Sequence, residues 1–245
     1  MITEYPFPIS ETDVSTLFNE ETNDLYIYHG TCQIYHEGIC KNGFAGCYSI
    51  FTNHELESLV KLLATLGMTD GDHNNRSVKY RIQKYIYENK SPSLSFTFSA
   101  YEAFYYASEL RKGGQIFMAI QDALNWIQQG NFELDEIGNK IIQELNRRIK
   151  QITISKGSVY CISVDKEVLN NLQHIDAMND VSNRFDAAKY TGLNIPVENI
   201  RGVIHLDSDY IPNYTLIKKI SDQIKANSTN KSASLVFQLK RKKFK

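Results

Sequence analysis

The run from Tyr26 to Thr31, which reads Tyr-Ile-Tyr-His-Gly-Thr, constrains the fold of this chain more than any other stretch. Its tyrosines and isoleucine alternate without a helix former, a pattern typical of a half-buried β-strand. His29 comes at the end of this strand, and Gly30 after it lets the backbone approach a ligand closely because it has no side chain. The sequence therefore predicts a histidine at a strand end that faces the contents of a cleft.

A short helical turn is predicted just after the strand, between Gly38 and Phe44. Gly43 occupies the position of a helix C-cap and is followed by the hydrophobic Phe44, which is the usual signature of a helix end. The pattern thus fixes the spacing along the chain between His29 and the glycine that ends the helix.

This spacing resembles the opening of the ADP-ribosyltransferase family, and more narrowly its poly(ADP-ribose) polymerase and diphtheria-toxin branch. In that family a strand ends in His-Gly-Ser/Thr, an isoleucine follows after the histidine, and a Gly-Leu/Phe pair closes the helix. Six positions of this chain fall in the same register without a gap: His29, Gly30, Thr31, Ile39, Gly43 and Phe44. The resemblance implies an α+β fold with a split antiparallel sheet and helical inserts, and it implies NAD as the substrate.

A second segment, from a predicted strand Ser93–Thr97 to a predicted helix Ala100–Leu110, supports the same resemblance. In the family, this helix carries a small residue and an aromatic residue near the nicotinamide, and matching Ala103 places Tyr105 at the stacking position. An aromatic face suits a planar, partly cationic ring. The alternative is a helix whose tyrosines are simply buried against the core.

The strand of this second segment mixes two patterns of the family. The tyrosine that the polymerase branch carries there is absent, and Ser95-Phe96-Thr97 instead resembles the Ser-Thr-Ser strand of the toxin branch. The resemblance implies a cofactor site made of His29, Gly30, Thr31, Ser95, Thr97, Tyr101 and Tyr105. In that site His29 is expected to bind ribose hydroxyls, Thr31 the adenosine side, and the Gly30 backbone the carboxamide.

Breaking the bond between nicotinamide and ribose passes through an oxocarbenium-like transition state, as glycoside hydrolysis does. The family stabilises this charge with a glutamate near the start of a late strand. The corresponding segment here, Arg184 to Tyr190, carries no glutamate, and Asp186 is its acid. Three interpretations stay open: Asp186 acts with a shorter reach, the substrate's own acid acts, or the domain is inactive. The first makes His29, Tyr105 and Asp186 the predicted catalytic residues.

Hydrophobic spacing predicts the other elements. Helices are expected over 53–66 (with Asn53 as N-cap), 77–87, 121–150 and 213–225, a buried strand over 115–120, an extended segment over 45–52, and strands over 158–165, 186–193 and 200–206. We therefore expect an N-terminal extension (1–24) that forms a loop or short helix. One domain (25–227) with helical inserts at 53–90 and 121–150 follows, and a basic tail (228–245) ends the chain.

Composition narrows the class of protein. No run approaches the about 18 apolar residues of a transmembrane helix, and no secretion signal is apparent, so a cytoplasmic protein or an effector delivered into a host cell is expected, with no membrane partner.

The histidines and cysteines share no metal-binding spacing, so no metal site is predicted. His36 is expected on a helix surface, and Cys32 and Cys40 as small core residues. The basic tail is either solvated or an arm for nucleic acid or an acidic partner.

Taken together, the sequence predicts a NAD-dependent mono-ADP-ribosyltransferase that modifies a macromolecule, either protein or nucleic acid, and releases nicotinamide. An antitoxin or inhibitor protein is a further expected class of partner. One alternative is a catalytically inactive domain of this fold that binds NAD or a partner, which the missing glutamate favours. Another is an RNA 2′-phosphotransferase-like enzyme, although its usual arginine and second histidine have no clear match here.

Overall fold

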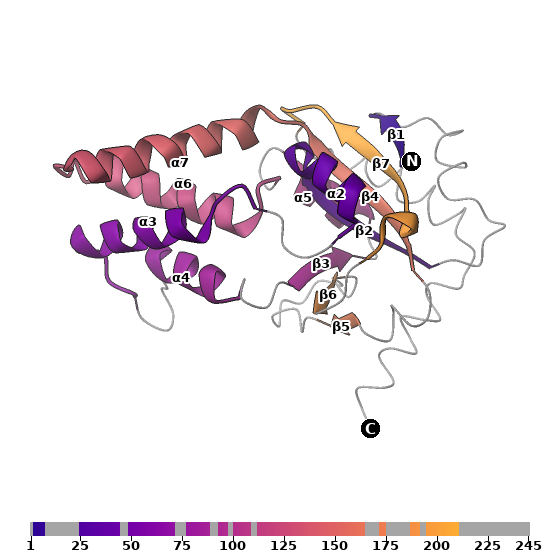
Figure 1. Cartoon of the computed structure of the whole chain (residues 1–245), viewed down its shortest axis with the longest axis horizontal. Coiled ribbons are helices and arrows are strands. Elements are labelled where there is room, and N and C mark those ends of the chain that lie inside the picture. The colour runs from indigo at the N-terminus through magenta and orange to yellow at the C-terminus, as the bar shows by residue number, and fades with distance from the viewer. Residues whose placement is uncertain are drawn as a thin grey trace, which may run out of the picture. The chain divides into compact units, whose positions relative to one another are not determined.

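The computed structural model describes residues 2–7, 25–44, 49–71, 77–88, 93–97, 100–108, 112–164, 172–174, 187–191 and 195–210. Over these ranges the chain combines helices with a sheet (Figure 1), which confirms the predicted α+β class. The chain divides into two compact units: residues 1–46, 93–112 and 156–245 form the first, and residues 47–92 and 113–155 form the second. The predicted helix over 213–225 and the basic tail lie outside the described residues.

The first unit contains a seven-stranded sheet. Its strands are β1 (Thr3–Pro6), β2 (Leu25–Cys32), β3 (Ser93–Thr97), β4 (Gly157–Val164), β5 (Leu172–His174), β6 (Ala187–Thr191) and β7 (Ile200–Leu206), in the spatial order β1-β7-β4-β2-β3-β6-β5. All pairs of described strands are antiparallel except β1 with β7, which are parallel. The prediction of a purely antiparallel sheet is therefore wrong at one edge, where N-terminal residues add a strand instead of the expected loop or helix.

Among the described residues, β2 pairs along its whole length with β4 but at a single position with β3. β2 pairs with β4 from Leu25↔Val164 to Cys32↔Gly157, whereas a single register pair, Tyr28↔Thr97, joins the described residues of β2 and β3. Figure 1 shows β3, β6 and β5 on one side of β2, and β4 and β7 on the other. We call β1, β7, β4 and β2 the first wing of the sheet and β3, β6 and β5 the second wing, and in the described part of the chain Tyr28 and Thr97 are the pair that joins them.

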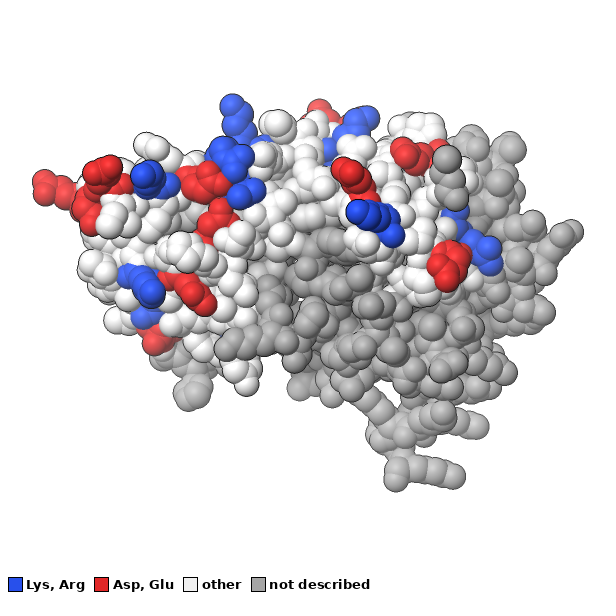
Figure 2. Space-filling view, viewed as in Figure 1, with Lys and Arg blue, Asp and Glu red and all other residues white. Residues whose placement is uncertain are grey.

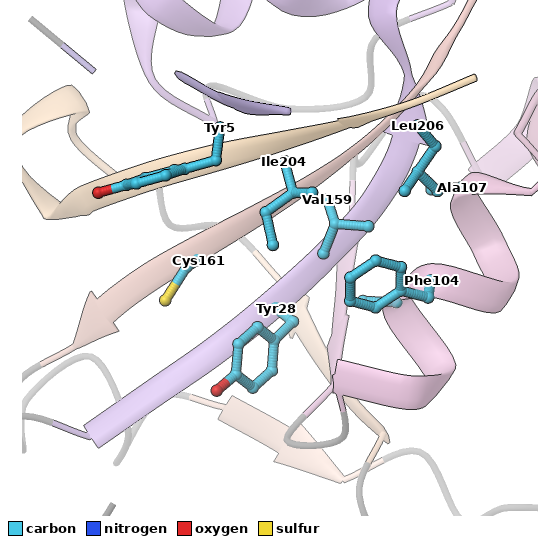
Figure 3. Packing of buried hydrophobic residues seen from close by; sticks show 9 residues of the cluster. Tyr5, Tyr28, Phe104, Ala107, Val159, Cys161, Ile204 and Leu206 are labelled. Carbon is cyan, nitrogen blue, oxygen red and sulfur yellow. The ribbon is translucent and has the colours of Figure 1, made fainter. Parts of the chain in front are cut away.

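Helix α5 (Ala100–Ala107) packs closely on one face of this sheet. A Cβ atom on Gly30 would lie 1.9 Å from the carbonyl oxygen of Ala103, and a Cβ atom on Gly157 would lie 1.9 Å from the carbonyl oxygen of Ala107. Only glycine lets the helix backbone come so near to both strands. A buried cluster surrounds the contact (Figure 3): Tyr5, Tyr28, Ala103, Phe104, Ala107, Val159, Cys161, Ile204 and Leu206.

Helix α2 (His36–Asn42), which follows the short 3-10 helix η1 (Gln33–Tyr35), contacts the opposite face. Successive side chains of a strand alternate between faces, so Tyr160 points away from the buried cluster that contains Val159 and Cys161. The ring of Tyr160 stacks on that of His36, with centroids 6.1 Å apart. The two faces of the sheet are therefore covered by different helices.

The end of α2 confirms the predicted C-cap. Gly43 has a φ of 64°, a conformation that favours glycine. Phe44 then pairs with Ile195: its N–H donates to the Ile195 carbonyl at 2.8 Å and its own carbonyl accepts at 3.2 Å. A Cβ atom on Gly43 would lie 2.1 Å from that same Ile195 carbonyl oxygen. The Gly-Phe pair thus joins α2 to the segment before the 3-10 helix η2 (Val197–Asn199).

The second unit is helical, with α3 (Asn53–Thr65), α4 (Val78–Glu88), α6 (Gly114–Gln129) and α7 (Glu136–Ile154). The helices predicted over 53–66 and 77–87 are confirmed, but the N-cap of α3 is Thr52 rather than Asn53. Thr52 and Glu55 form a capping box in which each side chain accepts from the other's backbone N–H. The Arg148 guanidinium of α7 lies 3.3 Å from the same Glu55 carboxylate, which joins α7 to α3.

The structure corrects the strand predicted over 115–120, because these residues belong to α6. Buried apolar side chains continue at helical spacing through Ile116, Ile120, Ala123 and Ile127. A run of five apolar residues, Ile116 to Ile120, does not by itself distinguish a buried strand from a buried helix. The predicted helical stretch 121–150 is confirmed as parts of α6 and α7, and the described residues 49–52 do not form a strand.

Charged side chains of both signs are interspersed over the described part of the face shown in Figure 2. In the second unit, for example, the Arg148 guanidinium also lies 3.1 Å from the Glu144 carboxylate. This distribution agrees with a net charge of −1. Among the helices of the described ranges, none combines the length and the apolar character needed to cross a bilayer.

Candidate functional site

His29 lies within β2 on the face that α2 contacts. Its neighbours Tyr28 and Gly30 point toward α5, so the alternation of side chains places His29 on the other face. The half-buried imidazole lies edge-on to the ring of Phe44, with centroids 5.0 Å apart, and is tilted against Phe96 at 5.5 Å. The predicted strand, helix end and second strand thus do meet around His29, in aromatic surroundings.

Gly30 is needed for a different reason from the one that the sequence suggests. The space that its missing side chain leaves is occupied by the Ala103 carbonyl of α5, so helix packing already requires glycine here. The main-chain edge of the strand is a separate matter. The one register pair between the described residues of β2 and β3 is at Tyr28, so Gly30 and Thr31 lie beyond that ladder.

The other predicted cofactor residues lie on β3 and α5. Thr97 is a buried residue of β3; Ser95 belongs to the same strand and Tyr101 to α5, but their side chains lie outside the described part of the structure. Tyr105 is half-buried on α5, with its ring 5.9 Å from that of Tyr106. Because α5 packs on the face opposite His29, the structure does not bring Tyr105 and His29 together on one face.

Thr97 marks the level at which three predicted elements lie side by side. It pairs with Tyr28 of β2 on one side and with Ala187 of β6 on the other. His29 follows Tyr28, and Asp186 directly precedes Ala187 in the sequence but lies outside the described residues. The strand predicted over 186–193 is confirmed as β6, and it neighbours the strand of the Ser-Phe-Thr pattern.

A second group of polar side chains, which the sequence does not predict, brings together Glu4 of β1, His36 of α2 and His205 of β7. Glu4 Oε1 lies 3.3 Å from His36 Nε2, and Glu4 Oε2 lies 3.2 Å from His205 Nε2. The two imidazole rings lie edge to face with centroids 5.0 Å apart. His36 is therefore not the surface residue that was expected: its side chain is 19% exposed and has partners on both nitrogens.

The second nitrogen of each of these histidines faces a hydroxyl group from β4. Tyr160 Oη lies 3.0 Å from His36 Nδ1, and Ser158 Oγ lies 2.9 Å from His205 Nδ1. A hydroxyl group can donate or accept, so it supports either tautomer of its histidine. Cys40 Sγ lies beside the group, 3.2 Å from His36 Nε2. Cys32 is buried as predicted, whereas Cys40 is only half-buried.

Burial controls the ionisation of this group. The pKa of His205 is lowered by burial and then by the nearby His36, against the opposing effect of Glu4. Burial raises the pKa of the Tyr160 phenol, and the Cys40 thiol adds to that shift. Burial, followed by the Glu4 carboxylate, raises the pKa of Cys40. Burial therefore favours a neutral His205 imidazole, while the Tyr160 phenol and the Cys40 thiol beside His36 stay protonated at neutral pH.

Comparison with known protein families, curated proteins and solved structures finds no match.

Proposed function

We propose that this chain is a NAD-dependent mono-ADP-ribosyltransferase that modifies a macromolecule, either protein or nucleic acid, and releases nicotinamide. The observation that carries the proposal is the double pairing of Thr97 with Tyr28 and Ala187. It places the strand of the His-Gly-Thr motif, the strand of the Ser-Phe-Thr pattern and the strand that Asp186 precedes next to one another. These motifs are far apart in the sequence, and a fold that separated their strands would have removed the basis of the resemblance.

The separation of the sheet into two wings also supports the proposal. Among the described residues, Gly30 and Thr31 lie beyond the β2–β3 ladder, at the edge of β2 that faces β3, β6 and β5. Main-chain N–H and C=O groups are strong hydrogen-bonding groups, and a carboxamide both donates and accepts. In the proposed complex, the Gly30 main chain binds the nicotinamide carboxamide, even though packing against α5 is what excludes a side chain there.

The placement of Tyr105 determines how the dinucleotide has to run. Tyr105 belongs to the helix that covers one face of the sheet, whereas His29 faces the other. In the proposed complex, the nicotinamide stacks on Tyr105 toward α5, and the ribose hydroxyls bind His29 on the other side of the β2 edge. NAD therefore crosses that edge rather than lying along one face.

The proposed reaction breaks the N-glycosidic bond of NAD, and nicotinamide leaves as a neutral molecule with the bonding electron pair. The ribose then carries an oxocarbenium-like charge, which the Asp186 carboxylate stabilises. A nucleophilic atom of the acceptor bonds to the same ribose carbon and loses its proton. Holding both reactants in place supplies much of the rate enhancement in such a transfer.

Labelled NAD, incubated with the purified chain alone and with cell lysate, tests the proposal. We expect label on a macromolecule with the wild type, and roughly 100-fold less with His29→Ala or Asp186→Ala. Asp209→Ala removes an exposed acid of the same unit and is the matched control, with unchanged labelling. Activity that survives Asp186→Ala but not His29→Ala would move the acid to another residue. The absence of NAD binding by the wild type would overturn the proposal.

A catalytically inactive NAD-binding domain is the second candidate, because β6 reads Ala-Ala-Lys-Tyr-Thr and carries no acid. Asp186→Glu separates the two, since it restores the missing methylene. An active enzyme limited by the reach of Asp186 should release nicotinamide faster with this variant. Binding of NAD without nicotinamide release by either the wild type or Asp186→Glu would favour the inactive domain.

A further inference from the structure

We infer that Glu4, His36 and His205 form a binding site for a divalent transition-metal ion, with zinc as the ion that best fits two imidazoles and one carboxylate. The site lies in the first unit, where β1 and β7 form an edge of the sheet and α2 begins. It uses none of the residues of the proposed ADP-ribosyl transfer. Binding there can therefore be measured whether or not the chain turns over NAD.

The distances between the candidate ligand atoms are those of a metal site. Zinc binds imidazole nitrogen and carboxylate oxygen at about 2.0–2.2 Å, so neighbouring ligand atoms of a tetrahedral site are about 3.3 Å apart. The two distances from the Glu4 oxygens to the histidine Nε2 atoms are 3.3 and 3.2 Å. One ligand atom from each of the three residues lies within 4.8 Å of the others. Side-chain rotations that bring these atoms closer by up to about 1.5 Å would surround one ion.

The second nitrogen of each histidine supports the same inference. Histidines that bind metals almost always make a hydrogen bond through their other ring nitrogen, and this fixes the ring and its tautomer. Tyr160 and Ser158 supply such a partner to Nδ1 of His36 and His205, at 3.0 and 2.9 Å. With each Nδ1–H donating to a hydroxyl oxygen, each Nε2 lone pair is directed toward the ion.

The accessibility of the three residues also suits an ion taken up from solution. The histidine side chains are 19% and 11% exposed, whereas the Glu4 side chain is 58% exposed. Three protein ligands leave one position of a tetrahedral zinc ion for water. Because Glu4 belongs to β1, the ion ties this N-terminal edge strand to α2 and β7. Bound metal should therefore stabilise the folded chain.

Two other interpretations of the cluster make different predictions. A Ser158–His205–Glu4 hydrolytic triad is excluded because Ser158 is fully buried and cannot reach a substrate. A metal-free network, in which both imidazoles donate Nε2–H to Glu4 while the hydroxyls donate to Nδ1, satisfies the same contacts. This network predicts that no ion binds, so a metal titration distinguishes it from the proposed site.

The test uses the full chain without a polyhistidine tag, stripped of metal with a chelator and then titrated with Zn²⁺ by calorimetry and with Co²⁺ by absorption spectroscopy. We expect one ion per chain and a cobalt spectrum of low coordination number, together with a higher melting temperature. His36→Ala, His205→Ala and Glu4→Gln should each abolish or greatly weaken binding. His54→Ala, which removes an exposed histidine of α3, is the matched control and should bind normally.

Tyr160→Phe keeps all three ligands and the aromatic ring but removes the partner of His36 Nδ1. Losing such an outer hydrogen bond weakens metal binding by roughly 10–100-fold. Circular dichroism confirms that each variant is folded, and Glu4→Gln, an exposed and nearly isosteric change, guards against a loss that is merely structural. Unchanged affinity in a His36→Ala/His205→Ala double variant would overturn the site. A folded wild type without saturable one-to-one binding would also overturn it.

Discussion

Two regions of the first unit contain histidines on the same face of one sheet but in opposite surroundings: the region around His29, and the region around His36 and His205. His29 lies on a central strand between the rings of Phe44 and Phe96. His36 and His205 lie near an edge, and each has a hydroxyl at Nδ1 and a carboxylate oxygen at Nε2. The rings around His29 are buried and hold its imidazole by packing, whereas polar partners on both nitrogens orient an imidazole as a metal ligand requires. The comparison teaches that the neighbours of a histidine decide which of the two proposed chemistries it suits.

Phe44 lies between the two groups and connects them. Its ring is 5.0 Å from that of His29 and 5.4 Å from that of Tyr160, whose hydroxyl group contacts His36. Phe44 is fully buried, and interiors packed this closely transmit changes of shape. The two regions therefore have different polar surroundings but share Phe44 as a packing neighbour.

The largest effect is expected from Phe44→Ala, which removes the buried ring that both regions contact. Truncating a buried phenylalanine costs about 3–5 kcal/mol, and we expect the free energy of unfolding in urea to fall by about 4 kcal/mol. NAD binding and zinc binding should weaken together, because both histidine groups lose a packed neighbour. Phe44→Leu, which keeps most of the side-chain volume, should reduce the free energy of unfolding, NAD affinity and zinc affinity by less than Phe44→Ala does.

Phe132→Ala is the control for this change, since Phe132 packs on Trp126 in the second unit. It should leave both binding events unchanged in protein that remains folded. If Phe44→Ala weakens only NAD binding or only zinc binding, Phe44 does not couple the two regions and they are independent.

Gly30→Ala sharpens the contrast between packing and ligand binding at the His-Gly-Thr motif. The new Cβ would lie 1.9 Å from the Ala103 carbonyl oxygen, so α5 has to move, and overpacking of this kind costs about 3 kcal/mol. Gly67→Ala, with open space around its Cβ but a φ of 89°, tests backbone strain alone and should cost about 1–2 kcal/mol. Equal stability of Gly30→Ala and the wild type would mean that only a ligand requires this glycine.

Sequence reasoning predicted the region around His29 much better than the region around His36. The strand at Tyr26–Thr31 and the cap at Gly43 are local patterns, and the structure confirms both. The prediction that this strand ends at His29 is wrong, because β2 continues to Cys32, fully paired with β4. The sequence singles out Gly30 but does not predict its contact with α5, because a close approach to a helix and a close approach to a ligand both require glycine. The strand predicted over 115–120 is wrong because a short apolar segment fits the periodicity of a buried helix as well as that of a buried strand.

No local sequence signal predicts the cluster that we propose to bind a metal ion. Glu4, His36 and His205 come from three distant segments, and no spacing motif connects them. They meet because β1 pairs with β7 in parallel and because α2 begins over β4, and both facts are tertiary. The parallel pairing was itself missed, since four N-terminal residues with one buried position give little strand signal.

A smaller effect is expected from Thr52→Ala, which tests whether the second unit bears on either histidine group. Loss of the capping box at α3 should cost about 1 kcal/mol, because Thr52 accepts from the Glu55 N–H and its own N–H donates to the Glu55 carboxylate. Thr52→Ser keeps both interactions and should be nearly neutral. Thermal unfolding measures the change, and NAD and zinc binding should be the same in both variants. A change in either binding event would make the second unit part of that site.

The smallest effect separates the two faces of β2 and β4 by their response to alkali. Burial raises the pKa of Tyr28, on the α5 face, and of Tyr160, on the α2 face, above the ordinary value of 10.0. The folded chain keeps protons that the unfolded chain releases above about pH 10, so this contribution to stability is complete below that pH and is lost as the pH rises. Melting temperatures measured between about pH 8 and about pH 11 should therefore fall less in Tyr28→Phe and Tyr160→Phe than in the wild type. Tyr160→Phe should also start lower, because it loses the contact with His36. Tyr106→Phe, at an exposed tyrosine, should follow the wild type at every pH, and a parallel decline in all four proteins would mean that neither buried phenol governs the alkaline loss.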